Sequence, residues 1–134
     1  MKQLFTAGLV VIENRKLLLA YSKNKRAWYL PGGKTADGES ADETLIREIE
    51  EELGIRISRK DLKYYTHITA PAFGENPDVI MEQECYLHNL MHRPLPSSEI
   101  EAVNFFDSRS YLEQAQVPGV VLLMRKLLED GLID

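Results

Sequence analysis

The chain has 134 residues, of which 44% are hydrophobic and 28% are charged, a composition typical of a globular protein that buries a core without cross-links. Its net charge of −5 argues against binding of long nucleic acid through a basic surface. The single cysteine, Cys85, excludes an internal disulfide framework and fits a reducing compartment, so we expect a cytoplasmic protein.

The predicted elements are short strands and two helices. We expect strands at residues 6–12, 16–21, 28–30, 62–69, 79–90 and 102–106, and helices at residues 41–53 and 120–130. The turn Glu13-Asn14-Arg15 predicts that the first two strands pair as a hairpin. The apolar run within residues 7–12 is too short to span a membrane. Pro31, Gly32 and Gly33 end the third strand. This order predicts an α/β fold with a mixed sheet flanked by helices.

The first predicted helix carries most of the acidity. Residues 37–52 contain eight carboxylates and one Arg, so the rest of the chain carries a net charge of about +2. Ser40 and Glu43 form an S-x-x-E capping box that starts the helix at Ala41, and Gly54 ends it. A local acidic excess of this kind is typical of a divalent cation site or of a solvated helix face.

A helical wheel separates the glutamates of this helix into two groups. With Leu45 at zero, Glu51, Glu48 and Glu52 lie at roughly 240°, 300° and 340°, whereas Glu50 lies at roughly 140° on the other flank. The first three form a patch that reaches the edge of the core stripe, which consists of Leu45, Ile46, Ile49 and Leu53. Like charges at this spacing repel, so Mg²⁺ or Mn²⁺ bound by oxygen ligands would explain the patch. The wheel alone does not exclude the alternative explanation, in which the three glutamates form a solvated helix face.

The spacing of these residues resembles the Nudix box. The match comprises Gly33, five residues, Glu39, seven residues, Arg47-Glu48-Ile49, one residue, Glu51-Glu52, one residue and Gly54-Ile55, so every fixed position is present over 23 residues. The resemblance implies that residues 1–134 form a single Nudix hydrolase domain, an α/β/α sandwich with a mixed β-sheet between helices. It also implies metal-dependent hydrolysis of a nucleoside diphosphate linked to another group.

The resemblance further implies roles for the residues of the box. Glu48, Glu51 and Glu52 would bind Mg²⁺, or Mn²⁺ as the alternative, together with the carbonyl of Gly32. Either Glu51 or Glu48 would act as the base, and Arg47 would complete the catalytic set by orienting the glutamates. The structural positions of the box would be Gly33, Glu39 and Gly54.

Further candidates lie outside the box. Glu99 precedes a late strand and is the candidate for a fourth metal ligand, with a solvated loop acid as the alternative; Glu82 and Glu101 are weaker candidates. His67, His88 and His92 lack the spacing of metal ligands.

Substrate contacts are expected from the loops. Lys34 is a candidate to bind a phosphate as a point charge, and Phe73 to contact a base. Arg26, with its neighbours Lys23 and Lys25, is a candidate to hold a polyphosphate, although such basic loops are more often simply solvated. Trp28 and Tyr29 alternate along a strand, so one is expected in the core and the other beside the substrate.

The resemblance to small MutT-like members implies cleavage of a nucleoside triphosphate to the monophosphate and pyrophosphate. An ADP-ribose or nucleotide-sugar pyrophosphatase is the alternative, since the position of Pro71, 16 residues after Ile55, resembles the spacing in ADP-ribose pyrophosphatases. A non-catalytic nucleotide-binding module is a third hypothesis. The stretch EQAQVPGVV before the last helix contains Gln114 and Gln116 but no Asn, which counts against MutT-type 8-oxoguanine specificity. The expected partner is a small nucleotide, and a homodimer stays open.

Overall fold

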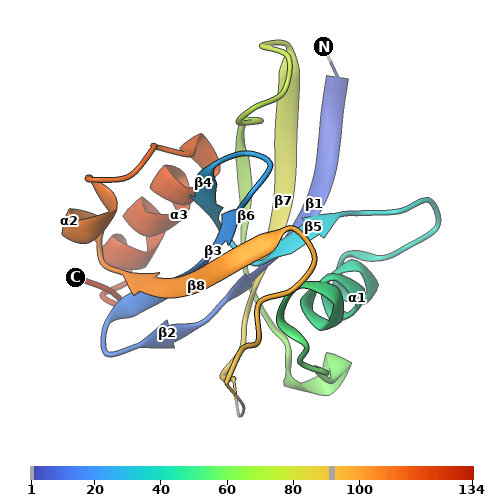
Figure 1. The fold of residues 1–134 in the computed structure, drawn as a ribbon, viewed down its shortest axis with the longest axis horizontal. Helices are drawn as coiled ribbons and strands as arrows, with labels where there is room; N and C mark the ends of the chain where they lie inside the picture. Colours follow the sequence, from blue (N-terminus) through green and yellow to red (C-terminus); the bar gives the residue numbers. More distant parts are fainter. Residues whose placement is uncertain (1, 91–92) are drawn as a thin grey trace.

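The computed structural model describes residues 2–90 and 93–134 and places the strands between two helices (Figure 1). His92 lies outside the described residues. In chain order the elements are β1 (Lys2–Val10), β2 (Ile12–Glu13), β3 (Lys16–Ser22), β4 (Ala27–Tyr29), β5 (Gly32–Lys34), α1 (Ala41–Leu53), the 3₁₀ turn η1 (Arg59–Asp61), β6 (Lys63–Pro71), β7 (Val79–Leu87), β8 (Ile100–Phe106), α2 (Ser108–Tyr111) and α3 (Pro118–Glu129).

The strands form two sheets. The first has the order β5-β1-β7-β6; β1 and β7 are parallel, and the other pairs are antiparallel. In the second sheet, β3 pairs with β2, β4 and β8, all antiparallel. The predicted α/β class is confirmed, and the first sheet is mixed as expected.

The predicted hairpin between residues 6–12 and 16–21 is largely wrong. Across the turn, Ile12 and Glu13 pair with Leu17 and Lys16, and the Leu18 N–H donates to the Val11 carbonyl at 2.9 Å. The preceding residues form β1 and pair instead with β7 over nine consecutive positions. The chain therefore changes sheets at Val11, because the long parallel ladder satisfies more backbone groups than the local turn offers.

The two sheets separate two hydrophobic cores. Consecutive side chains of a strand point to opposite faces, so Leu9 and Leu18 face α1, whereas Val10, Leu17 and Leu19 face α3. Burial of each of these leucines stabilises the fold by roughly 1.5–3 kcal/mol. Figure 1 shows α1 and α3 on opposite sides of the strands, the arrangement expected of an α/β/α sandwich.

Helix α1 has the predicted bounds because its ends are capped by local residues. The Ser40 side chain accepts a hydrogen bond from the Glu43 N–H at 3.3 Å, and the Glu43 carboxylate accepts one from the Ser40 N–H at 2.9 Å. Gly54 adopts a φ of 67° and donates its N–H to the Glu50 carbonyl at 3.1 Å. The predicted capping box and terminal glycine are therefore confirmed.

The carboxyl-terminal region departs slightly from prediction. Helix α3 begins at Pro118, two residues before the predicted start, because proline fits the first turn of a helix, where no N–H is needed. The short helix α2, capped by Asp107, was not predicted. Strand β7 ends at Leu87 rather than at residue 90. Within the described residues, no helix is long and apolar enough to cross a membrane.

Candidate functional site

Two glutamates of α1 point toward the glycines of β5. The Glu52 side chain is almost fully buried, with 6% of the residue exposed, and accepts a hydrogen bond from the Gly32 N–H at 3.1 Å. The Glu48 side chain is 18% exposed and lies against Gly33. The wheel placed Glu52 at the edge of the core stripe, and its burial confirms that position.

Burial makes ionisation of these two carboxylates unfavourable. It raises the pKa of Glu52 to about 8, against the opposing hydrogen bond from Gly32 and with smaller contributions from neighbouring carboxylates. Burial also raises the pKa of Glu48, although Arg47 opposes this effect. Such a pair favours a proton or a cation between its members.

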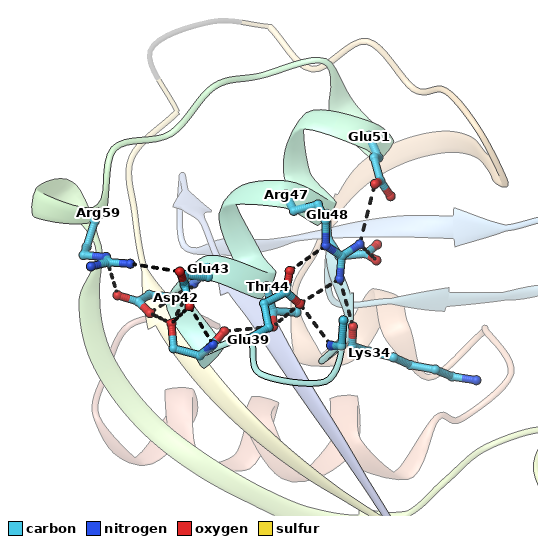
Figure 2. A network of polar contacts seen from close by, with 11 residues as sticks. Lys34, Glu39, Asp42, Glu43, Thr44, Arg47, Glu48, Glu51 and Arg59 are labelled. Carbon is cyan, nitrogen blue, oxygen red and sulfur yellow. Dashed lines mark hydrogen bonds and ion pairs between the residues drawn. The ribbon is translucent and has the colours of Figure 1, made fainter.

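Arg47 joins the box residues into one polar network (Figure 2). Its Nε and Nη2 donate to the two oxygens of Glu39 at 2.7 and 2.9 Å, and its Nη1 donates to Glu48 Oε1 at 2.9 Å. Nη1 also lies 3.5 Å from Glu51 Oε1, and Nη2 donates to the Lys34 carbonyl at 3.2 Å. Hydrogen bonds from Arg47 and from the Ala36 N–H lower the pKa of Glu39 to about 2. The bidentate pair fixes the guanidinium, which in turn orients Glu48.

Glu51 differs from its two neighbours because its side chain is 54% exposed and turns toward Arg47. It does not line the cleft described below, which Glu48 and Glu52 do line. Within residues 2–90 and 93–134, no three histidine, cysteine or acidic side chains converge closely enough to enclose an ion. The patch predicted on the wheel therefore comprises one buried carboxylate, that of Glu52, one partly buried carboxylate, that of Glu48, and the exposed carboxylate of Glu51.

The two glycines of β5 are required for different reasons. Gly32 has a φ of 143°, and a Cβ there would lie 2.0 Å from the Ala7 carbonyl oxygen, so a side chain would disrupt the pairing of β5 with β1. Gly33 has no such φ, but a Cβ there would lie 2.4 Å from Glu48 Cδ. Gly33 therefore provides the space that the Glu48 carboxylate occupies.

The Gly33→Ala variant is expected to fold normally and, in the hydrolysis assay proposed below, to lose about 100-fold in kcat, because the added methyl group displaces the Glu48 carboxylate by about an ångström. The displaced atoms are the free end of a side chain, so the thermal unfolding midpoint should stay close to that of the wild type. Unchanged kcat in a variant that melts like the wild type would contradict this role of Gly33. Steady-state kinetics and calorimetry provide the two readouts.

A cleft of about 430 Å³ extends from Glu48 and Glu52 between the two sheets. The lining contributed by the strands and loops includes Leu4, Tyr29, Leu30, Lys34, Phe73, Met81, Gln83 and Glu99. The cleft thus combines carboxylates at one part with apolar and aromatic side chains at another, the composition expected of a site for a small organic ligand.

Several contacts join residues 25–29 to the loop between β6 and β7, and both segments line the cleft. Lys25 Nζ lies 2.6 Å from Glu75 Oε2, and the Tyr29 hydroxyl donates to the Phe73 carbonyl at 3.3 Å. The rings of Tyr29 and Phe73 also meet edge to face, with centroids 6.1 Å apart. As expected, one member of the aromatic pair on β4 lines the cleft; the other, Trp28, packs against Phe106 in the core.

The structure brings some of the candidates outside the box together and leaves others apart. Lys34, Phe73 and Glu99 line the cleft, and Glu99 accepts a hydrogen bond from Asn24 Nδ2 at 3.0 Å. Arg26, the candidate to hold a polyphosphate, is exposed and is not part of the lining.

The weaker acidic candidates lie elsewhere. Glu82 contacts His67 and Thr69 at 2.7 and 2.6 Å on the face of β7 that points away from the cleft, and Glu101 is exposed on β8. Sequence reasoning also missed Gln83 in the cleft. Alternation along β7 places Met81 and Gln83 on one face, but the sequence contains no signal for which face meets the cleft.

Proteins similar to this chain are known. The model of the family described as NUDIX domain matches residues 2–128. A protein of Bacillus subtilis (strain 168), provisionally named an 8-oxo-dGTP diphosphatase, is 44% identical over 54 residues, which cover 38% of this chain and 36% of that protein. The mRNA-decapping protein D10 of Fowlpox virus (strain NVSL) is 32% identical over 96 residues, covering 66% of this chain and 43% of that protein. The chain therefore spans less than half the length of these two relatives.

Solved structures share the fold. The solution structure of the E. coli ORF135 protein matches with a TM-score of 0.72 at 22% identity, covering 96% of this chain and 91% of that chain. The MutT protein from Methanosarcina mazei Go1 matches with a TM-score of 0.75 at 17% identity, covering 97% and 96%. At these identities the likeness concerns the arrangement of the elements.

Proposed function

This chain belongs to the NUDIX domain family, and on that premise we propose that it is a metal-dependent hydrolase that cleaves a nucleoside triphosphate to the monophosphate and pyrophosphate. The observation that carries the proposal is the pair of desolvated carboxylates, Glu48 and Glu52, at one part of a cleft with aromatic walls. Cleavage of ADP-ribose or of a nucleotide sugar uses the same chemistry and is the second candidate.

The donor set fits a hard divalent cation. Glu48 and Glu52 offer oxygen atoms only, and burial makes their joint ionisation unfavourable unless a positive charge is near. Mg²⁺ prefers such ligands, and Mn²⁺ is the alternative. Glu51, with half of its side chain exposed, is free to leave Arg47 and join this set with the carbonyl of Gly32. Glu99, at the rim of the same cleft, is the proposed further ligand.

When bound, the cation neutralises phosphate oxygens and lowers the pKa of a water molecule. The residues of the chain supply positioning and proton transfer. Arg47 holds the carboxylate of Glu48 at 2.9 Å and is itself held by Glu39. Either Glu51 or Glu48 accepts the proton of the attacking water, and Arg47 contacts both carboxylates and orients them. Lys34 adds a positive charge beside the cleft for a phosphate.

The apolar part of the cleft suits a nucleobase. Tyr29 and Phe73 present aromatic surfaces beside Leu30 and Met81, against which a planar base packs well. The B. subtilis relative, whose provisional name describes a nucleoside triphosphate substrate, supports the first candidate over ADP-ribose.

The proposal is tested with the purified chain, Mg²⁺, and a panel of nucleoside triphosphates, ADP-ribose and nucleotide sugars. Release of pyrophosphate from a triphosphate, abolished by EDTA, is the expected result. Release of AMP from ADP-ribose at a higher kcat/KM would favour the second candidate. Tight nucleotide binding without turnover across the panel would contradict hydrolysis and identify a binding module.

A further inference from the structure

The amide side chain of Gln83, on β7, lies in the apolar part of the cleft. In the parallel ladder, Thr6 lies opposite Gln83 and Leu4 opposite Met81, so these four side chains form a continuous part of the cleft wall. Because the sheet order is β5-β1-β7, Gln83 lies two strands, or roughly 9–10 Å, from the glycines of β5 that border the carboxylates. A nucleotide with its phosphates over β5 extends its base toward β7.

Among the polar side chains next to the apolar part of the cleft, that of Gln83 has hydrogen-bonding capacity that is largely unused. Within the described residues, the only hydrogen bond of its side chain is a weak one, which Oε1 accepts from Cys85 Sγ at 3.8 Å; Nε2 donates none. The other polar side chains near the apolar part already have partners: Tyr29 with the Phe73 carbonyl, Lys25 with Glu75, Asn24 with Glu99, Ser22 with the Lys25 N–H, and Thr6 with the Glu82 carbonyl.

The backbone leaves room for this amide. A Cβ at Gly8, on the neighbouring strand β1, would lie 3.1 Å from Gln83 Nε2 and 2.3 Å from Leu30 Cδ2. The amide thus lies over the open surface of Gly8 and beside Leu30, in a wall that it shares with Leu4, Met81 and the hydroxyl of Thr6. An amide in such surroundings gains most from a ligand that supplies both a donor and an acceptor, because its own groups are partly removed from water.

We infer that Gln83 is a specificity-determining residue that hydrogen-bonds the edge of the nucleobase while Tyr29 and Phe73 contact its faces. A primary amide carries one donor and one acceptor side by side, which matches the adjacent donor and acceptor on the edge of a nucleobase. The inference rests on the proposed function only in taking a nucleotide as the ligand. It does not depend on turnover.

The test measures binding separately from hydrolysis. Calorimetry with Mg²⁺ and non-hydrolysable α,β-methylene triphosphates of adenosine, guanosine, cytidine and uridine gives four dissociation constants for each protein. The wild type is expected to discriminate among the bases. Gln83→Leu should lose about 5- to 150-fold in affinity for the preferred base and little for the least preferred, so the four constants converge. Gln83→Met provides the same readout if the Leu variant does not fold.

Gln3→Leu is the matched control, because Gln3 lies on the same sheet but faces away from the cleft and donates to Glu82 at 3.4 Å. It should bind all four nucleotides as the wild type does. Equal affinity of the wild type for all four bases would overturn the inference. An equal loss of affinity for all four nucleotides in Gln83→Leu would also overturn the inference, because it indicates that the side chain only fills space. Base-selective binding without any hydrolysis would support Gln83 as the specificity residue while contradicting the proposed enzyme activity.

Discussion

Replacing Glu51 by Gln is expected to reduce kcat by about 10²–10⁴-fold without weakening the fold. The Glu51 side chain is half exposed, and its ion pair with Arg47 Nη1, at 3.5 Å, is long. An exposed contact of this kind contributes little to stability, so the free energy of unfolding should change by less than about 0.5 kcal/mol. The loss of turnover follows because Gln neither accepts the proton of water nor binds a cation as a carboxylate does.

The matched control for this prediction is Glu50→Gln. Glu50 is the preceding residue of α1, has a similar exposure of 52%, and pairs with Arg56 at 3.3 Å on the other flank of the helix. Steady-state rates with Mg²⁺ and urea unfolding are measured for both variants. Turnover within tenfold of the wild type in Glu51→Gln would refute the proposed catalytic role of this residue. A comparable loss in Glu50→Gln would instead indicate a general effect of helix charge.

Replacing Glu52 by Gln is expected to stabilise the metal-free protein at pH 7 and to abolish activity. Burial raises the pKa of the Glu52 carboxyl group from an ordinary value of 4.5 to about 8. At pH 7 the folded chain therefore keeps a proton on Glu52 that the unfolded chain releases, and this difference lowers the free energy of unfolding by about 3 kcal/mol. A Gln side chain still accepts the hydrogen bond from the Gly32 N–H and carries no charge that must be desolvated.

The sign of the pH dependence follows from the raised pKa. Below pH 4.5, Glu52 is protonated in both states and adds no penalty. As the pH rises from 4.5 to 8, the unfolded chain releases the proton that the folded chain retains, and stability falls. Above pH 8, both states are ionised and the penalty is constant. The stability difference between Glu52→Gln and the wild type should therefore be small at pH 4.5 and reach its maximum by pH 8.

Urea unfolding in EDTA at pH 4.5, 7 and 8.5 measures this difference. Addition of Mg²⁺ should then stabilise the wild type but not Glu52→Gln, because a ligand that binds only the folded state adds to its stability. If the variant were less stable than the wild type in EDTA at pH 7, burial of the Glu52 carboxyl group would not destabilise the folded protein, which contradicts the prediction. Mg²⁺ stabilisation of the variant equal to that of the wild type would exclude Glu52 as a ligand.

Local patterns in the sequence determined helix α1 and the orientation of its side chains. Its capping residues, core stripe and terminal glycine act over four residues or fewer, so their effects are readable without the rest of the chain. For this reason the bounds Ala41–Leu53 and the burial of Glu52 agree with prediction. The box spacing likewise predicted the family, since it depends on the positions of residues along one helix and its flanks.

Only the tertiary structure decided which strands pair and which side chains share the cleft. Strand β1 pairs with β7, more than 70 residues later, instead of forming the predicted local hairpin. The same long-range pairing places Gln83 in the cleft and turns Glu82 away, and the ion pair of Lys25 with Glu75 joins residues 50 positions apart. Alternation along a strand specifies two faces but not which face meets a distant element, because that choice depends on the total burial and backbone pairing of the folded chain.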